Sequence, residues 1–430
     1  MSEQRGETNG SHTTGAPPPW VVVAGGFHAR GGMDRANAAL AHHLVARGHA
    51  LHLVAHSVEP ALAAHTSVTV HLAPRPAGSI LLGEHLLARR GREVARSLTQ
   101  QRAGARVVVN GGNCSWPDVN WVHSVHHAWP TSDAGAPLWF KAKNRLSHAL
   151  ARRGERRALD VARLVLANSD GTRRHLIELL GVKPEIVRTV YLGSDAGCRP
   201  ATVEERSAAC LRLGLTDARP VVAFVGALGH DNNKGFDTLW LAWKSLCARE
   251  DWDADLIVAG GGRGVRSWRE RVAAEGLTGR VRLLGFTEKV EEVLAASDLL
   301  VSPARYEAYG LNAHEAISRG VPALVSASAG IAERFTPSLR EMLLPDAEDA
   351  TDLATRLLRW RFDVDGWKTL FAPLASKLRR RTWDDMAADI VALVEGKAES
   401  QLRSAECGVP IDENDALYNP HSAIRTPHSL

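Results

Sequence analysis

The chain has 430 residues, of which 45% are hydrophobic and 23% are charged. This composition is ordinary for a soluble globular protein, and the length exceeds what one hydrophobic core supports, so we expect two domains of about 180 residues each. The five cysteines are scattered without a Cys-x-x-Cys pair, which argues against a structural zinc site and against a disulfide framework.

No stretch of the sequence approaches the roughly 18 consecutive apolar residues that a transmembrane helix needs. Residues 1–17 are polar and lack the apolar core of a signal peptide. Together with the cysteine usage, these observations predict a cytoplasmic protein whose residues 1–17 form a disordered tail.

The net charge of +4 is unevenly distributed along the chain. Residues 1–200 hold 24 Lys and Arg against 14 Asp and Glu, whereas residues 201–430 hold 28 against 34. Much of the excess lies in a predicted long helix, Phe140 to Val161. A solvated basic face is the simpler interpretation, and peripheral contact with the inner face of a membrane is the alternative. We expect no nucleic-acid partner.

The front half begins with a β-loop-α-β pattern. The apolar run Val21 to Ala24 predicts a buried parallel strand, and the glycine-rich loop 25–32 follows it, ending in Gly31 and Gly32. A helix is predicted from Met33 to Arg47 and a second strand from Ala50 to Ala55. A dinucleotide site would need Gly-x-Gly-x-x-Gly and an acidic residue after the second strand, and the sequence has neither.

A predicted strand near residue 120 ends in three histidines and a tryptophan, in the order His123, His126, His127 and Trp129. One of the histidines could act as an acid or base or bind a substrate hydroxyl. Packing histidines and a metal site are the alternatives, although no Cys or carboxylate stands at ligand spacing.

The second half repeats the alternation of strands and helices. A strand from Pro220 to Gly226 is followed by Lys234 and Gly235, where a predicted helix begins, and a lysine there suits a phosphate. The next strand ends in three glycines and Arg263. Ligands bind at these carboxyl ends in an open parallel sheet.

The apolar run Asp298 to Val301 predicts a buried strand, and residues 302–330 follow it with a tight loop, a short helix from Gly310 to Ser318 and a second extended run from Ala323 to Ser326. Two carboxylates, Glu307 and Glu315, are separated by seven residues, so that both could face one crevice. Between them the backbone N–H groups of three residues at the helix start would suit a phosphate, namely Tyr309, Gly310 and Leu311.

These features together resemble the retaining glycosyltransferases of family 4, which have the GT-B fold, over roughly Val21 to Glu395. The resemblance implies an α/β protein with two Rossmann-like domains and a cleft between them. The implied divisions are an acceptor-binding domain (residues 18–195), a nucleotide-sugar-binding domain (196–382), a helix packing back on the first domain (383–396) and a polar tail (397–430).

The resemblance also implies roles for single residues. Lys234 corresponds to the pyrophosphate lysine, Glu315 to the ribose-binding carboxylate and Glu307 to the carboxylate beside the donor sugar. Gly31 and Gly32 correspond to the loop that approaches the diphosphate. His123 corresponds to the histidine that contacts the sugar, with His126 as the alternative in a shifted register.

The sequence departs from the family pattern at Ala227, where members commonly have an arginine; Arg263 and Arg305 are the candidates to supply that charge. The linker of the family, Asn-Gly-Val-Asp, reads Leu-Gly-Ser-Asp over residues 192–195.

The implied activity is transfer of a sugar from a UDP- or GDP-sugar to an acceptor hydroxyl, with retention and without a metal or further cofactor. The implied setting is glycoconjugate biosynthesis of the bacterial type, with a glycan, a lipid-linked sugar or a small molecule as the acceptor. Glu307 would orient the sugar and would not be a nucleophile. A non-catalytic nucleotide-sugar- or glycan-binding protein and a sugar-nucleotide epimerase are the alternatives.

Overall fold

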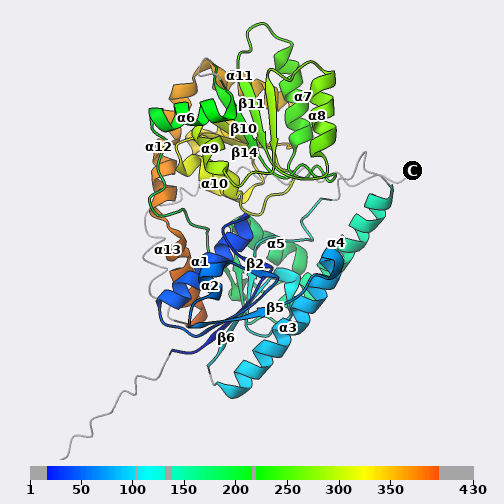
Figure 1. The fold of residues 1–430 in the computed structure, drawn as a ribbon, viewed down its shortest axis with the longest axis vertical. Coiled ribbons are helices and arrows are strands. Elements are labelled where there is room, and N and C mark those ends of the chain that lie inside the picture. The colour runs from blue at the N-terminus through cyan, green and yellow to red at the C-terminus, as the bar shows by residue number, and fades with distance from the viewer. Residues whose placement is uncertain (1–16, 103, 131–137, 216–218, 397–430) are drawn as a thin grey trace, which may run out of the picture.

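The computed structural model describes residues 17–102, 104–130, 138–215 and 219–396, arranged as two α/β halves (Figure 1). The C-terminal tail, 397–430, and all but the last residue of the N-terminal tail, 1–17, lie outside the described residues. Within the described ranges, no helix is both long enough and apolar enough to cross a membrane.

The front half is built on a parallel sheet of seven strands in the order β5-β3-β1-β6-β7-β8-β9. Both faces of the inner strand β1 (Trp20–Val23) are buried, because Val21 and Val23 pack in one core cluster and Trp20 and Val22 in another. The strands are β1 (Trp20–Val23), β3 (Leu51–Ala55), β5 (Val68–Leu72), β6 (Arg106–Asn110), β7 (Val119–Val122), β8 (Leu164–Ala167) and β9 (Val187–Thr189), and a separate pair is formed by β2 (Gly26–Phe27) and β4 (Ser57–Val58).

Helices cover both faces of this sheet, as the burial of alternate strand residues requires. Leu40 and Leu44 of α1 pack in the same cluster as Trp20, whereas Leu87 and Val94 of α3 pack in the cluster of Val21. The helices are α1 (Gly32–Ala46), α2 (Pro60–Ala63), α3 (Ile80–Gln101), α4 (Leu138–Leu159) and α5 (Asp170–Leu180), with short 3-10 helices at Pro76–Gly78, Gly111–Asn113 and Pro184–Ile186.

The back half has a parallel sheet of six strands in the order β12-β11-β10-β13-β14-β15. The strands are β10 (Val221–Val225), β11 (Asp255–Ala259), β12 (Val281–Gly285), β13 (Leu299–Ser302), β14 (Ala323–Ser326) and β15 (Leu343–Leu344). The helices are α6 (Val203–Leu213), α7 (Phe236–Cys247), α8 (Val265–Ala274), α9 (Val290–Ala295), α10 (Leu311–Ser318), α11 (Ala350–Phe362), α12 (Val364–Arg380) and α13 (Trp383–Val394), with 3-10 helices at Gly330–Arg334 and Pro337–Met342. Figure 1 shows α7 and α8 on one side of the sheet and α9 and α10 on the other.

The chain crosses between the halves twice, and the two crossings lie against each other. Ser194 on the first crossing forms a parallel bridge with Thr382 on the second. Beyond Thr382, α13 runs alongside α1 of the front half (Figure 1), where His43 hydrogen-bonds Asp384. Because α13 follows the back half in sequence and packs on the front half, it fastens the two together.

Two elements differ from the sequence-based expectation. The sequence predicts a strand over Ile186 to Leu192, but the observed strand is only Val187–Thr189, preceded by a 3-10 turn that starts at Pro184. Helix α12 was not predicted, because Pro373 in its interior is a helix-breaking signal. Its buried residues Phe371, Leu374 and Leu378 supply the core packing that overrides this signal.

The contact of the two crossings leaves no room for a side chain at position 193. A Cβ on Gly193 would collide with the carbonyl group of Thr382. Gly193→Ala should therefore lower the free energy of unfolding by about 1–3 kcal/mol, as overpacking does. Urea unfolding measures this, with Gly279→Ala as the control, since nothing lies within 4 Å of a Cβ there. Equal midpoints for the two variants would contradict the prediction.

Candidate active site

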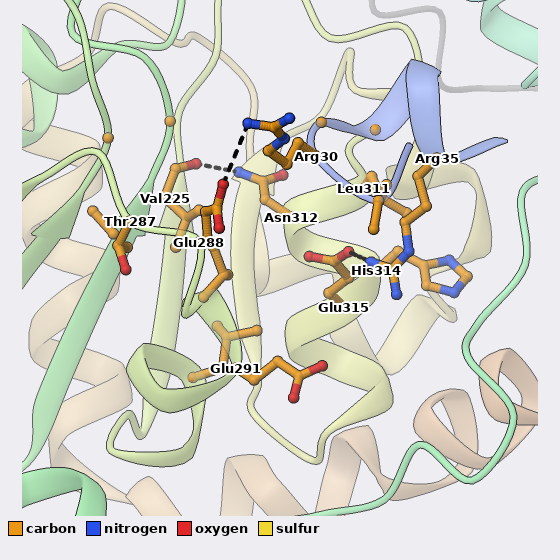
Figure 2. A pocket seen from close by; sticks show the side chains of 18 of the residues that line it. Arg30, Arg35, Val225, Thr287, Glu288, Glu291, Leu311, Asn312, His314 and Glu315 are labelled. Carbon is orange, nitrogen blue, oxygen red and sulfur yellow. Dashed lines mark hydrogen bonds and ion pairs between the residues drawn. The ribbon is translucent and has the colours of Figure 1, made fainter. Parts of the chain in front are cut away.

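A cavity of about 960 Å³ lies between the two halves, at the carboxyl ends of strands from both sheets. Its lining comes from the loop before α1, the first crossing, the loops after β10 and β11, the start of α10 and Trp383 of α13. Figure 2 shows part of this lining, with Arg30 and Arg35 on one side and Asn312 and Glu315 of α10 on the other. This volume suits a ligand of cofactor size.

The front wall of the cavity contains the predicted glycine pair. Gly31 has a φ of 86°, which favours glycine, and it is the N-cap of α1. A Cβ on Gly32 would lie 3.0 Å from the Leu311 side chain of α10. The glycines therefore let the front loop approach the back half closely.

The back wall is formed by the N-terminus of α10. Gly310 is its N-cap, with a φ of 102° and no side-chain capping hydrogen bond. Leu311, Asn312 and Glu315 line the cavity. The Asn312 amide donates to the carbonyl of Val225 at 2.8 Å (Figure 2) and so ties the helix start to β10. Tyr309 points away into the core, where its hydroxyl bonds His314.

An ion-pair network that the sequence did not predict joins the halves at the cavity. Arg35 of α1 donates to Glu315 at 2.6 Å and also to Asp195 of the first crossing (Figure 2 shows the Arg35 and Glu315 side chains). The indole N–H of Trp383 donates to Asp195 at 3.0 Å, and the guanidinium lies 5.5 Å from its ring centroid. Burial raises the pKa of Glu315, and Arg35 opposes that shift.

Lys234 lines the cavity from the loop before α7, and its ammonium group lies 2.6 Å from a carboxylate oxygen of Glu307. Gly235 has a φ of 72° and packs so closely on Pro303 that a Cβ would collide with its carbonyl oxygen. The two predicted glutamates thus have different cationic partners, since Glu307 pairs with Lys234 and Glu315 with Arg35.

Directly behind Glu315, the buried ring of His314 connects α10 to the first crossing. Ser194 donates its hydroxyl hydrogen to the carbonyl of Leu378 at 3.0 Å, so its oxygen accepts from Nε2 of His314 at 2.8 Å. Nδ1 then accepts from the Tyr309 hydroxyl at 2.6 Å. Burial lowers the pKa of His314 to about 3, with Arg334 and Arg35 acting in the same direction.

The predicted histidines lie outside the cavity lining. His123 follows β7 with its ring 4.3 Å from that of Trp121, and burial lowers its pKa to about 3. The ring of His126 lies near Trp129 and His148. At His123, Nε2 is buried without a hydrogen-bond partner among the described residues.

A buried carboxylate, which the sequence interpretation missed, fixes this histidine segment. Glu155 of α4 accepts hydrogen bonds from the backbone N–H groups of His126 and His127 and lies 2.7 Å from Nδ1 of His127. The sequence shows only a single glutamate among the arginines of α4, and the burial that makes a partner necessary is seen in the structure alone.

Neither arginine that was expected to replace the charge missing at Ala227 lines the cavity. Arg305 is engaged by Asp237 at 2.8 Å and Glu348 at 2.6 Å, and its side chain is 10% exposed. Arg263 lies 5.9 Å from the ring centroid of Trp139. The Arg305 guanidinium is therefore used elsewhere, while Arg30 and Arg319, which the sequence interpretation passed over, line the cavity.

Comparisons with known proteins agree with this two-domain site. Residues 30–197 match the family model described as Glycosyltransferase Family 4, and residues 219–361 match the model described as Glycosyl transferases group 1. Because one glycosyltransferase model matches each half, the two matches together indicate a GT-B glycosyltransferase. This family assignment confirms the glycosyltransferase resemblance that the sequence suggested.

Among curated relatives of this GT-B glycosyltransferase is mannosylfructose-phosphate synthase of Agrobacterium fabrum, 28% identical over 290 residues. The match covers 65% of this chain and 62% of the relative, so the chain spans less than two thirds of that relative's length.

Solved structures confirm the predicted GT-B fold. Sucrose-phosphate synthase from Thermosynechococcus elongatus superposes with a TM-score of 0.69 at 19% identity, over 90% of this chain and 100% of that one. The Anabaena protein HepE in complex with UDP-glucose gives a TM-score of 0.66 at 17% identity, over 88% of this chain and 99% of that one.

The neutral state of His314 makes the stability of this GT-B glycosyltransferase depend on pH. Its ordinary pKa is 6.5 and its folded value is about 3, so between these pH values the unfolded chain binds a proton that the folded chain does not. The free energy of unfolding should fall as the pH falls from 6.5 towards 3, with up to about 1.4 kcal/mol per pH unit coming from this residue.

His314→Gln should reduce the slope of the unfolding free energy against pH by the equivalent of nearly one bound proton, in urea unfolding measured from pH 7 to pH 4. His85→Gln is the control, because the side chain of His85 is exposed. A slope for His314→Gln equal to that of the unsubstituted protein would show that His314 is protonated in the folded state.

Proposed function

We propose that this protein is a retaining glycosyltransferase, which transfers a sugar from a UDP- or GDP-sugar to an acceptor hydroxyl without a metal ion. The observation that carries the proposal is the interdomain cavity, which holds Lys234, the glycine pair and Glu315 around the N-terminus of α10. Among the described residues no group of three or more His, Cys, Asp and Glu could hold a metal ion.

The donor would lie along the back half of the cavity. Lys234 and the N-terminus of α10 would receive the diphosphate, since a cation and unpaired helix N–H groups both favour anionic oxygens. Glu315 would accept hydrogen bonds from the ribose hydroxyls, and Glu307 from the donor sugar. Support for such a donor comes from HepE, whose structure was solved in complex with UDP-glucose.

In the proposed reaction the bond between the sugar C1 and the diphosphate oxygen breaks, and a bond from C1 to the acceptor oxygen forms on the same face. The acceptor proton passes to the departing phosphate oxygen, so no separate base is needed. Lys234, the α10 terminus and the Gly31 and Gly32 loop would stabilise the negative charge that grows on the diphosphate. Glu307 would position the sugar relative to the acceptor.

The acceptor would enter the cavity from the front half. Its class is a glycan, a lipid-linked sugar or a small molecule. We place the protein in the cytoplasm, and the exposed face of α4 provides the basis for peripheral membrane contact, because Trp139 and Leu146 stand there among basic residues.

A binding protein without turnover is the second candidate, and Ala227 favours it because the cavity wall there lacks the arginine that the resemblance leads one to expect. A sugar-nucleotide epimerase is a third. Product analysis separates them, since only a transferase releases nucleoside diphosphate in step with consumption of an acceptor.

Binding of the nucleotide is testable without knowing the sugar. A ligand at about 100 times its dissociation constant should add about 2.7 kcal/mol to the free energy of unfolding, because it binds the folded state alone. Thermal melting with UDP and with GDP should show a shift for one of them. UMP and GMP serve as controls and should give smaller shifts. No shift with either diphosphate would remove the basis for the donor site.

Loss of the cation or of the sugar-binding carboxylate should reduce activity. Lys234→Ala should lower kcat about 100-fold to 1,000-fold, because it removes stabilisation of the leaving group. Glu307→Gln should lower kcat/KM for the nucleotide sugar without weakening the binding of the nucleoside diphosphate. The control is Lys244→Ala, which removes a surface lysine paired with Glu275. Full activity in either site variant with unchanged melting would refute its assigned role.

A further inference from the structure

The glycine-rich front loop carries a second cation into the cavity. Arg30 directly precedes Gly31 and Gly32 and lines the same cavity as Lys234. Figure 2 shows its guanidinium reaching from the front half to Glu288 of the back half. The closest approach of these two side chains is 3.6 Å, and they are 67% and 62% exposed.

The other cations that line the cavity are more tightly held. Arg35 is shared between Glu315 and Asp195, Lys234 lies 2.6 Å from Glu307, and Arg319 lies 2.7 Å from Glu291. An exposed pair at 3.6 Å contributes little, about 0–1 kcal/mol. Arg30 is therefore the cavity-lining cation that an incoming anion displaces from its partner at the least cost.

The back wall needs such a cation from elsewhere. Ala227 offers only a methyl group in the cavity lining, and Arg263 and Arg305 lie outside that lining, where Arg305 is engaged by Asp237. A nucleoside diphosphate carries more negative charge than one lysine neutralises. A guanidinium adds a planar fork of donors that binds two phosphate oxygens at once.

We propose that Arg30 leaves Glu288 and binds the diphosphate of the donor, so that the front half supplies the cation that the back half lacks at Ala227. This inference rests on the proposed function. It makes the exposed Arg30–Glu288 pair a contact that the ligand replaces with a charge-assisted hydrogen bond. The front loop thereby contributes to donor affinity as well as to the shape of the cavity.

Isothermal titration of the full chain with UDP, UMP and uridine, and with the guanosine series, tests this inference. Arg30→Ala should weaken the binding of the preferred nucleoside diphosphate about 10-fold to 100-fold, the loss expected for one charge-assisted hydrogen bond. Binding of the nucleoside should change less than about 3-fold. Arg30→Lys should recover part of the loss, because it restores the charge without the fork.

Arg266→Ala is the matched control, since Arg266 is 91% exposed and pairs with Glu270 away from the cavity lining. Glu288→Gln should leave diphosphate affinity unchanged or raise it, because it releases Arg30. If the unsubstituted protein binds neither UDP nor GDP, the proposed function fails and this inference fails with it. If it binds one of them and Arg30→Ala binds equally well, only the inference is overturned. An equal loss for diphosphate and nucleoside would assign Arg30 to the shape of the loop and would also overturn it.

Discussion

The contact of Arg35 with Glu315 and Asp195 fixes how the two halves meet. One guanidinium from α1 stands between two carboxylates, one on α10 and one on the first crossing. Without it the two carboxylates would face each other in a partly buried place, which raises the cost of leaving both ionised. The register of α1 against α10 follows from this contact, and so does the approach of Gly32 to Leu311 that shapes the cavity.

A second layer of polar groups lies behind the Arg35 contact. Unlike that contact, this layer is buried and carries no charge. His314, Ser194 and Tyr309 satisfy one another's hydrogen bonds and hold the first crossing to the carbonyl of Leu378 on α12. A charged ring at position 314 would stand near Arg35, so its neutrality and the cationic network support each other. A rotation of the two halves about the crossings would have to keep all of these hydrogen bonds or break all of them.

The parts of the site that the sequence predicted are those that follow from strand order. Lys234, Gly32 and Glu315 reach the cavity because parallel strands bring their carboxyl ends to one edge of a sheet. Arg35 was missed, because an arginine within an amphipathic helix resembles any solvated residue and its partner lies 280 positions away. Arg305 was predicted to bind the ligand for a related reason. Its carboxylate partner Asp237 is 68 positions away in the sequence, so no local pattern shows that the arginine is already paired.

The fold shows the same contrast between elements that a local sequence pattern predicts and elements that depend on distant contacts. The strands with continuous apolar runs, such as β10 and β13, were predicted because burial on both faces leaves a local signature. Helix α12 left none, because Pro373 carries a breaker signal and only contacts with distant residues show that the segment is helical. Sequence periodicity reports burial along one element, whereas the choice of ionic partner depends on tertiary geometry.

The pairing of Lys234 with Glu307 has a consequence for how the proposed site would treat its ligands. The ammonium group of Lys234 and the carboxylate of Glu307 neutralise each other at 2.6 Å. A nucleotide sugar would separate them by giving the lysine phosphate oxygens and the carboxylate sugar hydroxyls, so both remain paired. A nucleoside diphosphate would offer partners to the lysine alone and would leave a partly buried carboxylate without a donor, which is costly. The ion pair would thus favour the intact donor over the product and so help the product to leave after transfer.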